Sequence, residues 1–313
     1  MWRVQYRRAP LGLLLRSGRL ALGSFSQGLS AAVQHSNRSI DALTRSIRPV
    51  LPRVARKLLD DGLLHTLQED NSPLQREIIL QSYLGNCQSA EEKHEIVVSF
   101  SLLLNHQRLF ENACESCLYH KSKCVCKHIE RASPCHKLWV LQHHGEYGRS
   151  NNTGSLLCLV AGAERTIRGL RDQQEQLLDH VHERKDSSAI LFPTGCSRTV
   201  KEYAAQRSLK LGSHEENEPL TLILLDGTSR QAKNLDRFMP GDIPRIRISK
   251  ASIQSWLNPI RKQTEEHRVC TAQAAAMILR ELGDFKTSDA IENAVKTVVR
   301  IACSQKRRLP AVD

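Results

Sequence analysis

Four short apolar runs alternate with longer segments of helical periodicity in the middle of the chain. They are residues 138–142 (LWVLQ), 189–192 (AILF), 220–225 (LTLILL) and 245–249 (RIRIS). Near-continuous apolar strands of this length are typical of a parallel sheet that is covered on both faces. The pattern therefore predicts an α/β fold with a mostly parallel sheet.

Helices are expected on both sides of this strand region. The predicted helical segments are a region at 50–112, then 164–185, 270–283 and 286–303. Within the first of them, a serine followed by Pro73 is a typical helix start. The helix at 164–185 is predicted because apolar residues from Ile167 to Val181 approach helical spacing. Residues 198–219 are expected to form an exposed loop.

The first 40 residues have a different character. They contain six arginines and no acidic residue, and basic and apolar positions are interleaved. This composition is typical of a mitochondrial presequence, so we expect residues 1–45 to direct the protein to the mitochondrial matrix. A disordered basic arm that binds RNA is the alternative interpretation.

The charge balance points to an anionic partner. The 313 residues carry a formal net charge of +12, which falls to +6 without the six leading arginines. The remaining excess still favours nucleic acid as a partner. No apolar run approaches the roughly 20 residues that a membrane-spanning helix needs.

Four of the ten cysteines form a cluster. Its members are Cys114, Cys117, Cys124 and Cys126. Two close pairs joined by a short loop suit a tetrahedral Zn²⁺ ion, because each pair holds one edge of the tetrahedron. Lys121, Lys123 and Lys127 are expected to lower the pKa values of these thiols. We predict a closed, structural zinc site, with Cys135 and His136 as spare ligands; a coincidental group of thiols or a redox pair is the alternative.

Polar residues follow two of the predicted strands. His143, Glu146, Arg149, Asn152 and Thr153 come after the strand at 138–142, at the end where open α/β sheets bind ligands. The first two of these residues are a candidate acid–base pair. An ordinary polar loop is the alternative interpretation.

The strand at 220–225 ends at a carboxylate. Asp226 is followed by Gly227 and Thr228, which allow the backbone to approach a ligand closely. The alternative is that Asp226 caps a helix that begins at about Ser229.

Two further segments have features of a binding site. The segment 191–195 (LFPTG) is a strand end that turns sharply through Pro193. Arg261 and Lys262 precede a helix entrance near Thr271, where free N–H groups suit a carboxylate or phosphate. A plain buried helix is the alternative.

Taken in order, these segments resemble the DTW-domain family, the tRNA-uridine aminocarboxypropyltransferases. The resemblance spans about residues 114–283. It rests on the cysteine cluster, LQHHGEYGRSNNTG, ILFPTG, LILLDGTSRQAKNL and IRKQTEEHRVCTAQAAA. The last two stand where the family has its D-x-T-W motif and an R-K pair followed by S-T-x-E-A. No single segment is specific, but five in this order are.

The resemblance implies a SPOUT-like fold with a knotted C-terminal part. It also implies that S-adenosylmethionine donates its 3-amino-3-carboxypropyl group to N3 of a uridine in tRNA, or less readily in rRNA. Asp226 would be the base that removes the N3 proton, or the group that orients this base.

The same resemblance assigns the remaining site residues. His143 and Glu146 would act on the uridine side. RNA contacts are expected from Arg149, Asn152 and Lys262. The cofactor-binding residues would be Pro193, Asp226, Gly227, Thr228, Arg261, Thr271, Ala272 and Gln273. The expected organisation is a presequence at 1–45, helices at 46–112, a zinc knuckle at 113–136 and the DTW/SPOUT-like domain at 137–305.

Two positions depart from the family pattern. Ser229 replaces the motif's tryptophan, which removes an aromatic wall whose stacking is worth about 1–3 kcal/mol. Gln273 replaces an acid, which removes a charge expected near the cofactor. Two alternative functions therefore stay open. One is a catalytically inactive DTW-fold protein that binds RNA or assists mitochondrial ribosome assembly, and the other is a SPOUT-type methyltransferase.

Overall fold

The computed structural model describes residues 53–70, 72–110, 114, 116–149, 152–211, 219–249, 254–260 and 269–306. These residues belong to one compact unit, Leu43–Asp313. The presequence expected at 1–45 lies outside the described residues, as do Arg261 and Lys262. Across the described part of the chain, no helix combines the length and apolar character needed to cross a bilayer.

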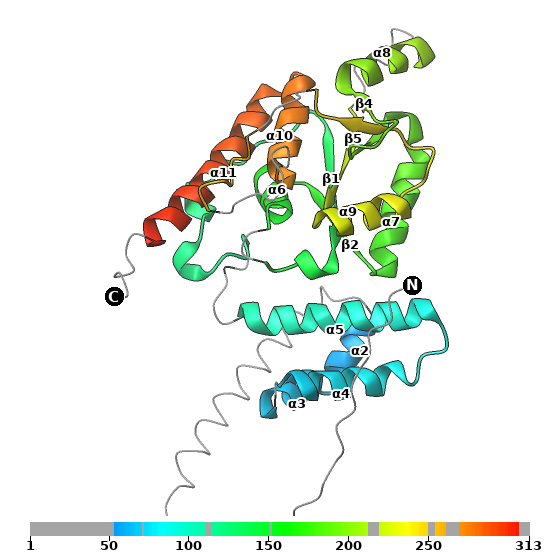
Figure 1. Cartoon of the computed structure of the whole chain (residues 1–313), viewed down its shortest axis with the longest axis vertical. Helices are drawn as coiled ribbons and strands as arrows, with labels where there is room; N and C mark the ends of the chain where they lie inside the picture. The colour runs from blue at the N-terminus through cyan, green and yellow to red at the C-terminus, as the bar shows by residue number, and fades with distance from the viewer. Residues whose placement is uncertain are drawn as a thin grey trace, which may run out of the picture. The chain divides into compact units, whose positions relative to one another are not determined.

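A six-stranded parallel sheet forms the centre of the fold (Figure 1). Its strands are β1 (Lys137–His143), β2 (Glu164–Arg168), β3 (Ser188–Leu191), β4 (Arg198–Thr199), β5 (Thr221–Asp226) and β6 (Arg245–Arg247). Their order across the sheet is β2-β1-β5-β3-β6-β4, and each neighbouring pair is parallel. The prediction of a mostly parallel α/β fold is confirmed.

Burial on two faces explains the near-continuous apolar runs in the central strands. In β5, Leu222 and Leu224 pack in one core cluster with α6 (Gly154–Ala161), α10 (Thr271–Glu281) and α11 (Phe285–Lys306). Ile223 and Leu225 pack in a second cluster with α7 (Arg171–Glu183) and α9 (Ser229–Phe238). Because successive side chains of a strand point to opposite faces, a strand between two helical layers has no solvent-facing position.

Among the described residues, four α-helices precede the sheet, as predicted for 50–112. They are α2 (Arg53–Asp60), α3 (Leu63–Glu69), α4 (Pro73–Leu84) and α5 (Ala90–Phe110). Val98 of α5 packs with Ile167 and Leu170 at the end of β2. The contact is so close that a Cβ at Gly169 would clash with the side chain of Val98, and Gly169 also has a positive φ of 106°. A glycine is therefore needed where α5 meets the sheet.

The prediction of one helix over 164–185 is wrong in its first part. Residues Glu164–Arg168 form the edge strand β2, and α7 begins only at Arg171. Ile167 faces α5, whereas Leu177 and Val181 of α7 face the second core cluster. The apparent helical stripe therefore joins residues that are buried against two different surfaces.

The exposed loop predicted at 198–219 is also partly wrong, because β4 and then α8 (Val200–Leu211) occupy its first part. The helix α6 was not predicted at all. Six of its residues are buried, including Leu156, Leu157 and Val160, so it has no polar face to produce a helical period. The two C-terminal helices expected at 270–283 and 286–303 are confirmed as α10 and α11.

Candidate functional site

Asp226 lies at the carboxyl end of β5, next to Gln142 of β1 in the sheet register. Its side chain is almost completely buried, with an exposed fraction of 4%. Oδ2 accepts hydrogen bonds from Nε2 of Gln142 at 2.8 Å and from Nδ2 of Asn152 at 2.6 Å. Oδ1 accepts a hydrogen bond from Oγ1 of Thr271 at 2.7 Å. Three donors aimed at one carboxyl group are the arrangement that an ionised carboxylate requires.

The backbone of α6 comes unusually close to this carboxylate. A Cβ at Gly154 would lie 2.7 Å from Cγ of Asp226, a separation that real Cβ atoms do not reach. Gly154 is the first residue of α6, and Thr271 is the first residue of α10. The partial positive charge of two helix N-termini therefore faces the carboxylate and offsets the cost of burying it.

Thr228, not Asp226, caps helix α9. Its Oγ1 accepts a hydrogen bond from the N–H of Gln231, while Oε1 of Gln231 accepts one from the N–H of Thr228 at 2.7 Å. This reciprocal capping box satisfies two helix N–H groups without the preceding acid. The interpretation of Asp226 as a cap is therefore wrong, and its carboxylate is directed into the side-chain network.

His143 lies at the end of β1 and stacks on His144, with 4.3 Å between the ring centroids. Its Nδ1 accepts a hydrogen bond from the N–H of Gly145 at 3.1 Å, which places the proton of the neutral ring on Nε2. Burial lowers the pKa of His143 below its usual 6.5, and neighbouring positive charges add to the effect. The ring is therefore neutral near pH 7 and presents a donor, not a free base, at Nε2.

The other residues of this loop have separate partners. The Glu146 carboxylate is buried and forms an ion pair with Arg149, with 3.0 Å between Oε1 and Nη1. Asn152 is 5% exposed and is occupied within the Asp226 network, because its Oδ1 accepts bonds from Gln142 and from the N–H of Ser155. Asn152 thus lies in a position suited to holding the carboxylate rather than to exposed contact with RNA.

The residues expected around a cofactor are only partly brought together. Ala272 is buried, and its N–H donates to Oγ1 of Thr153, which ties α10 to the loop before α6. Pro193 is exposed at the carboxyl end of β3, beside β5 in the sheet. It lies at the same edge of the sheet as Asp226, because the strands are parallel.

The four clustered cysteines converge on one point. The Sγ atoms of Cys114 and Cys126 are 3.7 Å apart, those of Cys117 and Cys124 are 3.9 Å apart, and all four lie within 4.8 Å of one another. Zinc–sulfur bonds of about 2.3 Å in a tetrahedron separate the sulfurs by about 3.8 Å. The donor set and its spacing therefore fit a metal ion of this type.

The turn within the cluster supports the same geometry. Leu118 has a left-handed φ of 60°, and its N–H donates to the carbonyl of Cys114 at 2.9 Å. The pKa of the Cys114 thiol is lowered to about 7, first by the backbone N–H of Cys117. Backbone amides and neighbouring thiols are the source of this shift, and no lysine contributes. Burial raises the pKa values of Cys117 and Cys126, so the expected lowering of the thiol pKa values by the lysines is wrong for these two residues.

The region that holds the four-cysteine cluster and the strand-terminal aspartate matches a known family. The sequence model of the DTW domain matches residues 111–305. The chain belongs to the DTW-domain family. No solved structure matches the chain.

Ser229 occupies the position of the tryptophan in the DTW motif. It is the first residue of α9 and is half-buried, directly after the cap Thr228. The small hydroxyl side chain supplies no ring for stacking at this end of β5. The serine at this position therefore changes the surface of the site and leaves the hydrogen bonds of Asp226 intact.

Gln273, the second departure from the DTW pattern, is 1% exposed and holds a neighbouring segment. Its Oε1 accepts from the N–H of Trp256 at 2.9 Å, and its Nε2 donates to the carbonyl of Gln254 at 2.8 Å. An acid cannot form both bonds, because an ionised carboxylate has no donor. The side chain is thus occupied by the 254–256 segment, which differs from the expectation that it faces the cofactor.

Sequence reasoning missed two residues of the DTW-domain site. Gln142 was assigned only to an apolar strand, and Gly154 was not singled out. A polar residue at the last positions of the run LWVLQ was the available signal for Gln142. Nothing in the sequence indicates that Gly154 contacts a residue 72 positions later, because only the fold brings them together.

Proposed function

We propose that this DTW-domain protein transfers the 3-amino-3-carboxypropyl group of S-adenosylmethionine to N3 of a uridine in mitochondrial tRNA. Membership of the DTW family, which is associated with tRNA modification, supports this reaction class. The observation that carries the proposal is the buried carboxylate of Asp226, held by Gln142, Asn152 and Thr271.

The donor set around Asp226 suits a polar ligand. Oε1 of Gln142 is buried and has no hydrogen-bond partner among the described residues, so it can accept a bond from a ligand N–H. Thr271, Ala272 and Asp226 would hold the cofactor at this edge of the sheet. When bound, S-adenosylmethionine would supply an electrophilic carbon beside its sulfonium, whose C–S bond breaks to release methylthioadenosine as the N3–C bond forms.

The protein's own residues handle the uridine proton. Oδ1 of Asp226 accepts one hydrogen bond among the described contacts, whereas Oδ2 accepts two. Oδ1 is therefore the atom with room for the proton that leaves N3. His143 donates from Nε2 to a carbonyl of the uracil ring and fixes its orientation, because Gly145 occupies the other ring nitrogen.

The remaining parts of the proposal concern the scaffold. A structural zinc ion bound by the four cysteines holds residues 114–126 together. The C-terminal part forms a SPOUT-like knot, and the sequence before 46 directs the protein to mitochondria. The all-parallel sheet and the bonds from Gln273 to the 254–256 segment are compatible with such a C-terminal arrangement.

Calorimetry and nucleoside mass spectrometry test the reaction. The purified protein is titrated with S-adenosylmethionine, and tRNA is then analysed for 3-(3-amino-3-carboxypropyl)uridine after incubation. Asp226→Asn should reduce the transfer rate by at least about 100-fold. Asp179→Asn is the matched control, because Asp179 is exposed on α7 and should leave the rate unchanged. A protein that binds no cofactor and modifies no uridine contradicts the proposal.

A catalytically inactive RNA-binding protein is the second candidate. Ser229 supports it, because the motif's aromatic ring is missing at the end of β5. The same experiment separates the two candidates, since an inactive protein retains affinity for RNA and forms no modified uridine. Ser229→Trp should then leave the inactive protein inactive, whereas in an active enzyme it should tighten base or cofactor binding.

A further inference from the structure

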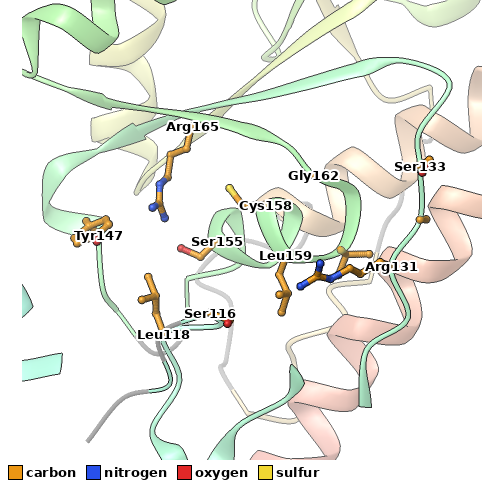
Figure 2. Close-up of a pocket in the computed structure, with 12 residues that line it drawn as sticks. Ser116, Leu118, Arg131, Ser133, Tyr147, Ser155, Cys158, Leu159, Gly162 and Arg165 are labelled. Atoms are coloured by element: carbon orange, nitrogen blue, oxygen red, sulfur yellow. The ribbon is translucent and has the colours of Figure 1, made fainter. Parts of the chain in front are cut away.

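A cavity lies beside α6, and its lining on this helix begins at Ser155, one residue along from Gly154. Its volume is about 520 Å³. Ser155, Cys158 and Leu159 of α6 line it, together with Gly162 directly after the helix, and the four recur at the spacing of one helix face. Figure 2 shows the guanidinium of Arg165 pointing toward the space between Tyr147 and Ser155. The cavity thus uses a different face of α6 from Gly154, which contacts Asp226.

The charge of the cavity is positive. Arg131 and Arg165 both line it, and none of its twelve described lining residues is acidic. Neither arginine forms an ion pair with a described residue. Two uncompensated guanidinium groups favour an anion and disfavour S-adenosylmethionine, whose sulfonium and ammonium are cationic.

Ser155 adds an unused polar atom. Its side chain is 8% exposed, and Oγ has no hydrogen-bond partner among the described residues. A buried hydroxyl without a partner costs stability, which makes a ligand acceptor at this position favourable. A phosphate oxygen between Ser155 and Arg165 would satisfy this group.

The cavity walls are held in place by the fold. Arg165 lies in β2, opposite Val140 of β1, and its guanidinium carbon lies 5.0 Å from the centroid of the Tyr147 ring. The segment that carries Arg131 is tied to α6 by a hydrogen bond of 2.8 Å from the N–H of Ala132 to the carbonyl of Val160. The Arg165 guanidinium is therefore positioned before any ligand binds, and the backbone that carries the exposed Arg131 is fixed beside α6.

We propose that this cavity binds the sugar-phosphate backbone of the substrate RNA beside the reacting uridine. Arg165 and Ser155 hold one phosphate, and Arg131 contacts the backbone at the other end of the cavity, beside Leu159. The volume is in the range of about 300–1,000 Å³ that ligand pockets cover, and it is larger than a single phosphate needs. The proposal rests on the proposed function, because it names how that site binds its RNA.

The salt dependence of RNA binding tests the arginines. The affinity of the full chain for an unmodified mitochondrial tRNA transcript is measured over a range of salt concentrations. Arg165→Gln and Arg131→Gln should each weaken binding about fivefold to tenfold. Each should also reduce the slope of log K against log salt by about 0.7 to 0.9, the value for one lost phosphate contact. Arg237→Gln is the matched control, because Arg237 is exposed on α9 and lies outside the cavity.

Ser155→Ala gives an independent readout. Because Oγ has no described partner, its removal should leave the thermal midpoint unchanged or raise it. Affinity for the tRNA should nevertheless fall about twofold to fivefold. A variant with lowered stability and unchanged affinity would contradict a ligand role for this hydroxyl.

Further outcomes separate this proposal from its rivals. If both arginine variants bind tRNA with the slope of the control, the cavity is not an RNA site, even when the uridine is still modified. If uridine monophosphate or inorganic phosphate binds with an affinity that depends on Arg165 while the tRNA slope is unchanged, the cavity serves a small anion and the proposal is wrong. If no modified uridine forms but both arginine variants show a reduced slope of log K against log salt, the cavity binds RNA and the proposed transfer reaction is wrong.

Discussion

The cysteine cluster takes its four sulfur atoms from residues 114–126, whereas the hydrogen bonds around Asp226 join residues between 142 and 271. The cluster is half-exposed and is built from tight turns, including the left-handed Leu118. The Asp226 network is buried and needs β1, β5 and the first turns of α6 and α10.

This difference separates two ways of assembling a polar site. A local cluster depends on its ligand and on a few turns, because a metal ion supplies most of its stability. A distributed network depends on packing between distant elements, because each donor reaches the carboxylate only when the layers are docked. Perturbing one site should therefore leave the other largely unchanged.

The largest effect is expected at the cysteine cluster. Cys117→Ser should abolish binding of the proposed zinc ion and lower the free energy of unfolding by more than about 4 kcal/mol, because such an ion would supply folding energy to the segment that binds it. Metal analysis and thermal denaturation measure this result. Cys196→Ser is the control, since Cys196 is exposed and lies outside the cluster. An equal zinc content in both variants would contradict the proposal that the cysteine cluster binds zinc.

A smaller but clear effect is expected from Gly154→Ala at the distributed site. The added Cβ would lie 2.7 Å from Cγ of Asp226, so the carboxylate or the start of α6 must move. We expect the free energy of unfolding to fall by about 1–3 kcal/mol, with zinc content unchanged. Chemical denaturation measures it against Gly241→Ala, where no atom lies within 4 Å of the new Cβ. Equal stability of the two variants would show that the network is not tightly packed.

Gln273→Glu tests the role of Gln273, the second position that departs from the family pattern. Glutamate keeps the bond from the N–H of Trp256 but loses the donor to the carbonyl of Gln254. The loss should lower the free energy of unfolding by about 1–2 kcal/mol. Gln176→Glu on the exposed surface of α7 is the matched control. If Gln273→Glu is instead neutral and improves cofactor affinity, Gln273 faces the cofactor as first expected.

The smallest expected effect is a pH dependence of the free energy of unfolding, and it arises from His144 where this residue meets α5. Burial, with help from the charges of His143, His94 and Arg168, lowers the pKa of His144 from 6.5 to about 4. As the pH falls, the histidine of the unfolded chain is protonated before His144 of the folded chain. The contribution of His144 to stability is therefore fully present above about pH 6.5 and is lost as the pH is lowered toward 4.

We expect a loss of about 1 kcal/mol or less, since the ring is only half-buried and solvent screens its charge. Denaturation curves between pH 7 and 4 should be flatter for His144→Gln than for His182→Gln. The same slope in both variants would exclude His144 as the group that titrates.

The sequence predicted the elements that are buried on both faces. The runs at 138–142, 189–192 and 220–225 are β1, β3 and β5, the three strands in the middle of the sheet order. The sequence did not predict β2 at the sheet edge, because Ile167 and Leu170 have helical spacing. It also did not predict α6, which is buried on almost all sides. In both cases the apolar period reflected contacts with more than one surface.

The candidate site was predicted to a similar extent. Asp226 and Thr271 were singled out from their places at a strand end and a helix start, and the structure joins them at 2.7 Å. The partner Gln142 and the glycine at 154 were missed. Their importance comes from contacts across 84 and 72 positions of sequence, which no local pattern encodes.

By itself, the sequence determined the parallel sheet, the cysteine cluster and the position of an acid at the end of β5. Each of these depends on residues that are close along the chain, or on a burial pattern that repeats within one strand. The tertiary structure decided that this acid is held by side chains and not used as a helix cap. It also placed two arginines without an ion pair among the described residues in one cavity beside α6, because only the packing of separate elements brings such groups together.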